Sequence, residues 1–274
     1  MPATLNIVGA GHVGRTLGRL FAAHGALTVQ DVLTRSPDSA ARAVAFIGAG
    51  RAVAGLAELR PAAAWMLAVG DDAIAPTCAA LAKAGLLRDA VVFHCSGAKA
   101  SDELRAPGAL VASVHPVRSF ADPDAVAAAF AGTWCGVEGD AGALALLTPA
   151  FEAIGARLVA IDAAAKTVYH AASVFAANYL VTVLDAALRA YVAAGVPEAV
   201  ARELAQPLAS ETLANVFRLG PAAALSGPVA RGDVATVARQ QAAVAHWDAP
   251  TGRLYEALVE ATTSLAERKR RGQP

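Results

Sequence analysis

Short apolar segments alternate with helical stretches over roughly the first 160 residues of the chain. The apolar segments predict seven strands: Thr4–Val8, Leu27–Leu33, Ala63–Val69, Ala90–His94, Leu110–His115, Thr133–Val137 and Arg157–Ala160. The stretches between them predict four helices: His12–His24, Pro37–Ile47, Asp72–Ala84 and Gly139–Ile154. This alternation is typical of an α/β fold with a doubly wound parallel sheet, whose ligand binds at the carboxyl ends of the strands.

The strand pattern stops after Ile161-Asp162, and the remaining chain is predicted to be helical. Residues Ala164–Ala194 form one long helix, which ends at Gly195 with Pro197 just beyond. Three further helices follow: Pro197–Leu219, Asp233–His246 and Pro250–Arg268. We therefore predict a sheet domain over residues 1–162 and an all-α domain over residues 163–274.

The long helix is apolar on several faces. Its apolar side chains include Val168, Val174, Phe175, Leu180, Val181, Val183 and Leu184. A helix that is apolar nearly all round must be buried, either inside a bundle or against a second subunit. We therefore expect a homodimer that forms through the C-terminal helices.

The composition excludes several classes of protein. Hydrophobic residues make up 56% and charged residues 17% of the chain, which is enough for a sizeable core and argues against disorder. Basic and acidic residues both number 23, so no overall charge attracts nucleic acid or anionic lipid. The three cysteines are widely spaced, which suggests neither a metal site nor a disulfide framework. No signal peptide is recognisable, and polar residues break the apolar runs well short of 18 positions, so we expect a cytoplasmic protein without a membrane span.

A glycine motif follows the first predicted strand directly. It has the G-x-G-x-x-G spacing, in which the first glycine permits a tight turn, the second lets the backbone approach a pyrophosphate, and the third lets the helix pack on the strand. The helix N-terminus would face the phosphates. The residues expected to hold a dinucleotide are Gly9, Gly11, His12, Val13 and Gly14. A glycine-rich turn without a ligand is the alternative.

The second strand should end near the adenosine ribose, about 20 residues after the motif. The sequence there contains Thr34, Arg35 and Ser36 and no carboxylate. The arginine fork and the serine hydroxyl suit a 2′-phosphate, which favours NADP. Two alternatives remain: Asp31 could bind the ribose hydroxyls of NAD, and Arg35 could be an ordinary loop arginine.

Three more strand ends carry polar residues. Val69 and Asp71 would lie near the nicotinamide ribose, and Asp71 or Asp72 is also expected to cap a helix. Ser96 would hydrogen-bond the substrate or the nicotinamide, or else cap a tight turn. His115 would act as an acid or a substrate ligand, or else hold the loop that follows it.

Steps of four along the long helix place Lys166, His170 and Asn178 on one face. Burying such groups without partners costs several kcal/mol for the charge and about 1–3 kcal/mol for the amide, so we expect them to face a cleft. Lys166 or His170 would then protonate an alkoxide or amine as hydride arrives, and Asn178 would orient the substrate. The alternative is an exposed lysine and an asparagine that bonds between helices.

A loop between the later helices contains three polar candidates. Asp233 should cap the following helix, and Ser226 and Arg231 could reach the site. Arg231 would suit a substrate carboxylate. A purely structural turn is the alternative.

Taken in order, these motifs cover almost the whole chain. The strings concerned are Gly9–Gly14, Thr34-Arg35-Ser36, His94-Cys95-Ser96-Gly97, Ser113-Val114-His115-Pro116, Lys166–Ala172, Asn178 and Ser226–Asp233. The pattern resembles little-characterised bacterial oxidoreductases that pair a Rossmann-like NADP domain with a helical domain of unknown function. These are similar to pyrroline-5-carboxylate reductase, ketopantoate reductase and the 6-phosphogluconate dehydrogenase group. The better-known relatives place a lysine and an asparagine four apart, whereas here Lys166 is followed four residues later by His170.

The sequence and the resemblance together predict an NADP-dependent oxidoreductase. It would transfer a hydride between nicotinamide and a small carbonyl, imine or alcohol in a cleft between its domains. The alternatives are a dinucleotide-binding sensor or scaffold without turnover, and a site for another ligand such as a flavin.

Overall fold

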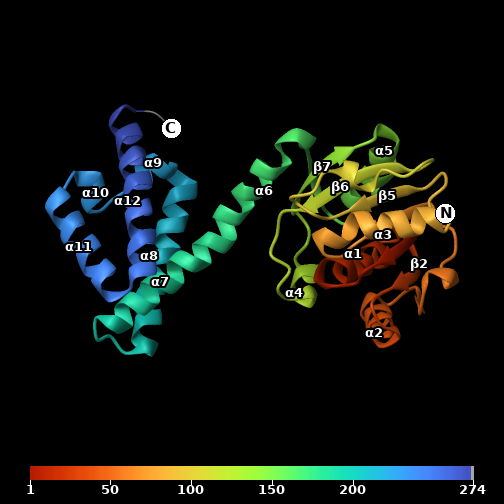
Figure 1. The fold of residues 1–274 in the computed structure, drawn as a ribbon, viewed down its shortest axis with the longest axis horizontal. Coiled ribbons are helices and arrows are strands. Elements are labelled where there is room, and N and C mark those ends of the chain that lie inside the picture. The colour runs from red at the N-terminus through yellow and green to blue at the C-terminus, as the bar shows by residue number, and fades with distance from the viewer. Residues whose placement is uncertain (273–274) are drawn as a thin grey trace. The chain divides into compact units, whose positions relative to one another are not determined.

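A computed structural model describes residues 1–272 of the chain (Figure 1). The chain divides into two compact units, Met1–Ala177 and the residues from Asn178 onward. The boundary lies within the long helix, further along the chain than the predicted break after Asp162. The first turns of that helix belong to the sheet unit because they pack against its strands.

The first unit contains an eight-stranded sheet with the order β3-β2-β1-β4-β5-β6-β7-β8. Its strands are β1 Thr4–Val8, β2 Thr28–Leu33, β3 Arg51–Val53, β4 Ala64–Leu67, β5 Val91–His94, β6 Leu110–Pro116, β7 Trp134–Gly139 and β8 Arg157–Ala160. All neighbours pair in parallel except β6 and β7, which are antiparallel. The predicted fold class is confirmed, but the expectation of an entirely parallel sheet is wrong at β7, and β3 was not predicted.

Helices cover both faces of the sheet. They are α1 His12–Ala23, α2 Pro37–Ile47, α3 Asp71–Lys83, α4 Pro123–Ala128 and α5 Ala141–Ala153, with short 3₁₀ turns at Leu56–Glu58, Ser101–Leu104 and Ala163–Ala165. Met66 of β4 packs in the core cluster that includes Phe21 of α1 and Phe151 of α5. The next residue, Leu67, packs in a second cluster with Ile74 of α3. Alternate side chains of one buried strand therefore enter two apolar layers.

The long helix consists of α6 Lys166–Val174, a π-helical segment Phe175–Tyr179 and α7 Leu180–Ala193. The second unit continues with α8 Glu198–Leu219, α9 Pro221–Ala224, α10 Pro228–Arg231, α11 Val234–Trp247 and α12 Ala249–Arg270. Within this unit α7 packs on α8, and α11 packs on α12. The predicted cap at Asp233 is confirmed, since its carboxylate accepts the Thr236 N–H at 3.0 Å. The short helices α9 and α10 replace part of the predicted loop.

The segment Ala163–Ala193 is long and apolar enough, by length and composition, to cross a membrane. It has 31 residues, its most apolar window has a mean hydropathy of 1.5, and none of that window is buried. Polar residues interrupt this helix less than expected, because most of them are uncharged. The expectation of a protein without a membrane span is not tested by this finding, since the core helix of a soluble protein meets the same criteria.

Candidate functional site

The turn after β1 has a geometry that requires glycine at two positions. Gly9 has a φ of +83°, and a Cβ built there would lie 2.6 Å from the Ala68 carbonyl oxygen. A Cβ on Gly14 would lie 2.6 Å from the Gly9 carbonyl oxygen. Gly11 differs, because a Cβ there meets nothing within 4 Å. The first and third glycines thus serve the turn and the packing of α1, and the second leaves open space beside the backbone.

Among the described residues, no side chain caps the N-terminus of α1. Gly11 is the N-cap residue and is exposed, so the first N–H groups of the helix face outward without an internal acceptor. This arrangement favours the binding of an anion at the N-terminus of α1. The side chain of His12 is occupied elsewhere, because its Nδ1 donates a hydrogen bond to the Phe120 carbonyl at 2.6 Å. Val13 lies half-buried against the core.

The end of β2 presents an exposed arginine beside a helix N-terminus. Arg35 forms no ion pair or hydrogen bond with any residue in the described range 1–272. Ser36 caps α2 by accepting the Ser39 N–H at 3.3 Å, which leaves its hydroxyl proton free to donate. Thr34 donates from Oγ1 to the Ser36 carbonyl at 2.9 Å. An anion at this place would meet one guanidinium and one hydroxyl.

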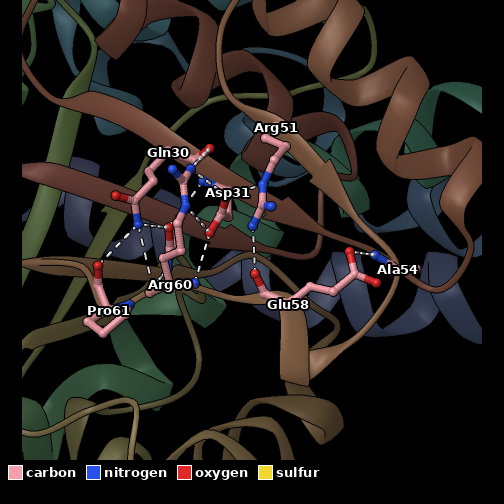
Figure 2. Close-up of polar contacts among 8 residues, drawn as sticks. Gln30, Asp31, Arg51, Ala54, Glu58, Arg60 and Pro61 are labelled. Atoms are coloured by element: carbon pink, nitrogen blue, oxygen red, sulfur yellow. Dashed lines mark hydrogen bonds and ion pairs between the residues drawn. The ribbon is translucent and has the colours of Figure 1, made fainter.

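Asp31 is held inside a structural cluster (Figure 2). Its side chain is fully buried and accepts from Arg51 Nε at 3.0 Å, from the Arg60 backbone N–H at 2.9 Å and from the Arg60 guanidinium at 2.7 Å. Burial alone would raise the pKa of Asp31, but these hydrogen bonds lower it to about 2. Both carboxylate oxygens are occupied, so the alternative in which Asp31 binds ribose hydroxyls does not fit the structure.

The ends of β4 and β5 provide two further groups. Gly70, and not Asp71 or Asp72, is the N-cap of α3; Asp71 is the exposed first residue of that helix, and Val69 is half-buried. Ser96 Oγ accepts the N–H groups of Ala98 and Lys99 at 3.2 and 3.1 Å. The turn-capping interpretation of Ser96 therefore fits, and its hydroxyl proton is still free to donate.

A row of buried polar residues crosses three neighbouring strands. His94 of β5 lies opposite Ser113 of β6, which lies opposite Glu138 of β7, and all three are buried. His94 Nδ1 accepts the Ser96 N–H at 3.2 Å, so its Nε2 carries the proton and donates to the Ala100 carbonyl at 3.1 Å. Burial lowers the pKa of His94, which favours this neutral ring.

Lys166, the first residue of α6, lies over this row. Its Nζ donates to Glu138 Oε1 at 3.1 Å and to Ser113 Oγ, and the side chains of Lys166 and Glu138 are only 3% and 6% exposed. Ser101 completes the set by donating its N–H and hydroxyl to Glu138 at 2.8 and 2.6 Å. Burial lowers the pKa of Lys166, and the bond to Glu138 opposes that shift. The alternative of an exposed lysine is wrong, because the charge is buried and paired.

The next residues on the same face of α6 meet the end of β6. His115 Nδ1 lies 2.9 Å from the Tyr169 hydroxyl, and the rings of His115 and His170 are 5.8 Å apart. Two glycines make room for these rings: a Cβ on Gly97 would lie 2.8 Å from His115 Nε2, and a Cβ on Gly136 would lie 2.5 Å from the Tyr169 oxygen. Burial and the neighbouring His170 lower the pKa of His115 to about 4.

The first unit thus brings together three of the predicted catalytic residues: Ser96, Lys166 and His170. Asn178 is exposed and is the first residue of the second unit, to which Ser226 and Arg231 also belong. Sequence reasoning missed Glu138 and Tyr169. Glu138 could have been found as a lone carboxylate in an apolar strand. Tyr169 could have been found because it lies three residues after Lys166, on the same face of the helix.

Comparison with known proteins supports the predicted resemblance. A family described as "Domain of unknown function (DUF2520)" matches residues 133–262. No curated protein matches the chain. Protein TM1727 from Thermotoga maritima is 28% identical, with a TM-score of 0.77 over 97% of this chain and 99% of its own.

Two other solved structures are similar at lower identity. The "putative NADP oxidoreductase BF3122" from Bacteroides fragilis is 21% identical, with a TM-score of 0.77 over 96% of this chain and 98% of its own. Plasmodium falciparum pyrroline carboxylate reductase with NADP bound is 13% identical, with a TM-score of 0.59 over 96% and 98%. The expected Rossmann-like unit followed by a helical unit is confirmed.

Proposed function

We propose that the chain is an NADP(H)-dependent oxidoreductase that acts on a small carbonyl, imine or alcohol. The observation that carries this proposal is the turn at Gly9–Gly14, whose open helix N-terminus shares a sheet edge with the groups that follow β5 and β6. The names of the Bacteroides and Plasmodium proteins, which refer to NADP, agree with it.

The residues present fit this cofactor. The backbone from Gly9 to Gly14 would hold the pyrophosphate, and Arg35 with Ser36 and the N-terminus of α2 would hold the 2′-phosphate. Val69 and Asp71 would lie at the nicotinamide ribose. When bound, the cofactor supplies or accepts a hydride at its nicotinamide ring.

The surroundings of the two proton-handling candidates support a different role for each. His170 is half-exposed beside Gly97 and can exchange a proton with a ligand there. Lys166 is buried, and its ammonium is committed to Glu138 and Ser113. We assign proton transfer to His170 and a positioning role to Lys166, which steadies the Ser96 turn because Ser113 Oγ donates to the Ser96 carbonyl at 3.3 Å.

Replacing Arg35 with alanine tests the cofactor. We expect the Kd for NADPH to rise about 10- to 100-fold, since a hydrogen bond to a charged group contributes about 1.5–3 kcal/mol, and the Kd for NADH to change little. The measurement is fluorescence titration with each nucleotide. Arg42→Ala, at an exposed position on α2, is the matched control and should leave both values unchanged. Equal weakening of both nucleotides by Arg35→Ala would reject the 2′-phosphate assignment.

We also infer that the exposed apolar surface of α7 and α8 is covered by a second copy of the chain. Val181, Leu208 and Phe217 are 67%, 60% and 87% exposed. Charged side chains are costly in the hydrocarbon core of a membrane. Helix α8, which packs on α7, carries five of them: Glu198, Arg202, Glu203, Glu211 and Arg218. A protein partner therefore explains the surface better than a bilayer does.

The dimer is tested by sedimentation equilibrium without detergent. We expect twice the chain mass of 27.6 kDa for the wild type and a monomer for Leu208→Glu. A monomeric wild type that partitions into lipid vesicles would contradict the inference.

A further inference from the structure

The hydroxyl of Tyr169 lies 2.9 Å from His115 Nδ1, within hydrogen-bond distance. The Tyr169 oxygen also lies against Gly136, where a Cβ would be 2.5 Å from it. Burial raises the pKa of Tyr169, so the phenol keeps its proton. When this phenol donates to His115 Nδ1, the neutral imidazole carries its own proton on Nε2.

The Nε2 atom of His115 lies beside Gly97. A Cβ built on Gly97 would lie 2.4 Å from His170 Cδ2 and 2.8 Å from both Cε1 and Nε2 of His115, so a larger residue there would displace these two rings. Within residues 1–272, Nε2 has no hydrogen-bond partner, whereas both ring nitrogens of the neighbouring His94 have one. With the proton on Nε2, His115 would present one donor without a partner inside the protein.

This donor lies at the sheet edge of the glycine turn. Strands β1, β4, β5 and β6 are parallel, so Gly9, Gly97 and His115 follow or end strands at the same edge. Two glycines, Gly97 and Gly136, are needed to accommodate the ring and the phenol that orients it.

The ring also keeps one charge state near neutral pH. The pKa of His115 is lowered to about 4 by burial and by His170 and Lys166, and Asp71 opposes this shift. The ring of His115 is therefore neutral at pH values well above 4 and keeps one N–H donor near neutral pH.

We propose that His115, held by Tyr169 with its proton on Nε2, donates a hydrogen bond to the carbonyl oxygen of the substrate. This rests on the proposed function and narrows its substrate class to aldehydes and ketones and the matching alcohols. As hydride adds to the carbonyl carbon, the oxygen becomes an alkoxide, which His115 stabilises without losing its proton. His170 then supplies the proton that completes the alcohol. A protonated imine would instead present an N–H to the His115 N–H, and the two would repel.

The first test reads the tautomer without turnover. Long-range ¹H–¹⁵N spectra of the protein between about pH 6 and 8 should show His115 neutral with its proton on Nε2, and His115→Gln assigns the signal among the six histidines. Tyr169→Phe should give a mixture of both neutral forms. A wild-type proton on Nδ1, or a charged ring, would overturn the assignment of the donor.

The second test uses pyruvate, acetaldehyde and cyclohexanone as carbonyl probes and 2-methyl-1-pyrroline as an imine probe, each with NADPH. Wild type should reduce a carbonyl probe. His115→Leu should lower kcat about 100-fold with little change in the KM for NADPH, and His115→Gln, which keeps an N–H donor, should retain most of the activity. Preference for the imine, or a His115→Leu variant as active as wild type, would reject the proposal. If neither class is turned over, the proposed function fails and this substrate assignment fails with it, while the tautomer result stands separately.

Discussion

Replacing Lys166 with methionine is expected to lower the free energy of unfolding by about 3–5 kcal/mol. The substitution keeps the length of the side chain but leaves the Glu138 carboxylate buried without its cation. Ser101 still donates two hydrogen bonds, but these do not neutralise the charge. The measurement is urea denaturation at pH 7, followed by circular dichroism.

Two further variants make this test specific. Lys166→Met combined with Glu138→Gln removes both charges and should recover at least half of the lost stability, because the cost lies in the unpaired carboxylate. Lys99→Met breaks the exposed pair of Lys99 with Glu103 and should cost no more than about 1 kcal/mol. If Lys166→Met proves as mild as Lys99→Met, the buried ion pair is not a main support of the sheet unit.

The second large effect is expected at Gly11, where valine should abolish NADPH binding without unfolding the protein. A Cβ there meets nothing within 4 Å and the backbone is extended, so the fold can accept the side chain. The valine would fill the space reserved for the pyrophosphate and cover the first N–H groups of α1. Loss of two hydrogen bonds to a charged group corresponds to a rise in Kd of about 100-fold or more.

Isothermal titration with NADPH measures this effect, and the melting temperature monitors the fold. Gly55→Val is the matched control, since Gly55 is also extended and also has open space around its Cα. We expect both variants to melt like the wild type and only Gly11→Val to lose NADPH. Unchanged binding by Gly11→Val would mean that the glycine turn serves the fold alone.

Local signals explain why many elements could be predicted from the sequence. Helix α2 has the predicted limits because Ser36 caps it, Pro37 occupies its first position, and Gly48 ends it with a φ of +78°. The strand β3 has three residues, too few to show a period. The reversal of β7 depends on pairing with β6, which no local pattern reveals.

The candidate site also has one part that local sequence predicts and one part that it does not. The glycine turn is a continuous motif, so its geometry was predictable from six neighbouring residues. The partner of Lys166 was not, because Glu138 lies 28 positions earlier in the chain and reaches it only through the register of β7. Because burying an unpaired lysine is costly, the sequence predicted that Lys166 faces a ligand in a cleft. In the fold, the charge of Lys166 is instead paired with the buried carboxylate of Glu138.

The antiparallel pairing of β6 with β7 has a consequence for folding fidelity. Ser113 faces Glu138 and His115 faces Gly136 across the same two strands. A slip of β7 by one residue would turn Glu138 into the opposite apolar layer and place a bulkier neighbour where Tyr169 now fits. Glu138 and Gly136 therefore disfavour a misaligned sheet, because a shifted β7 would carry a buried, unpaired charge and could not pack against α6.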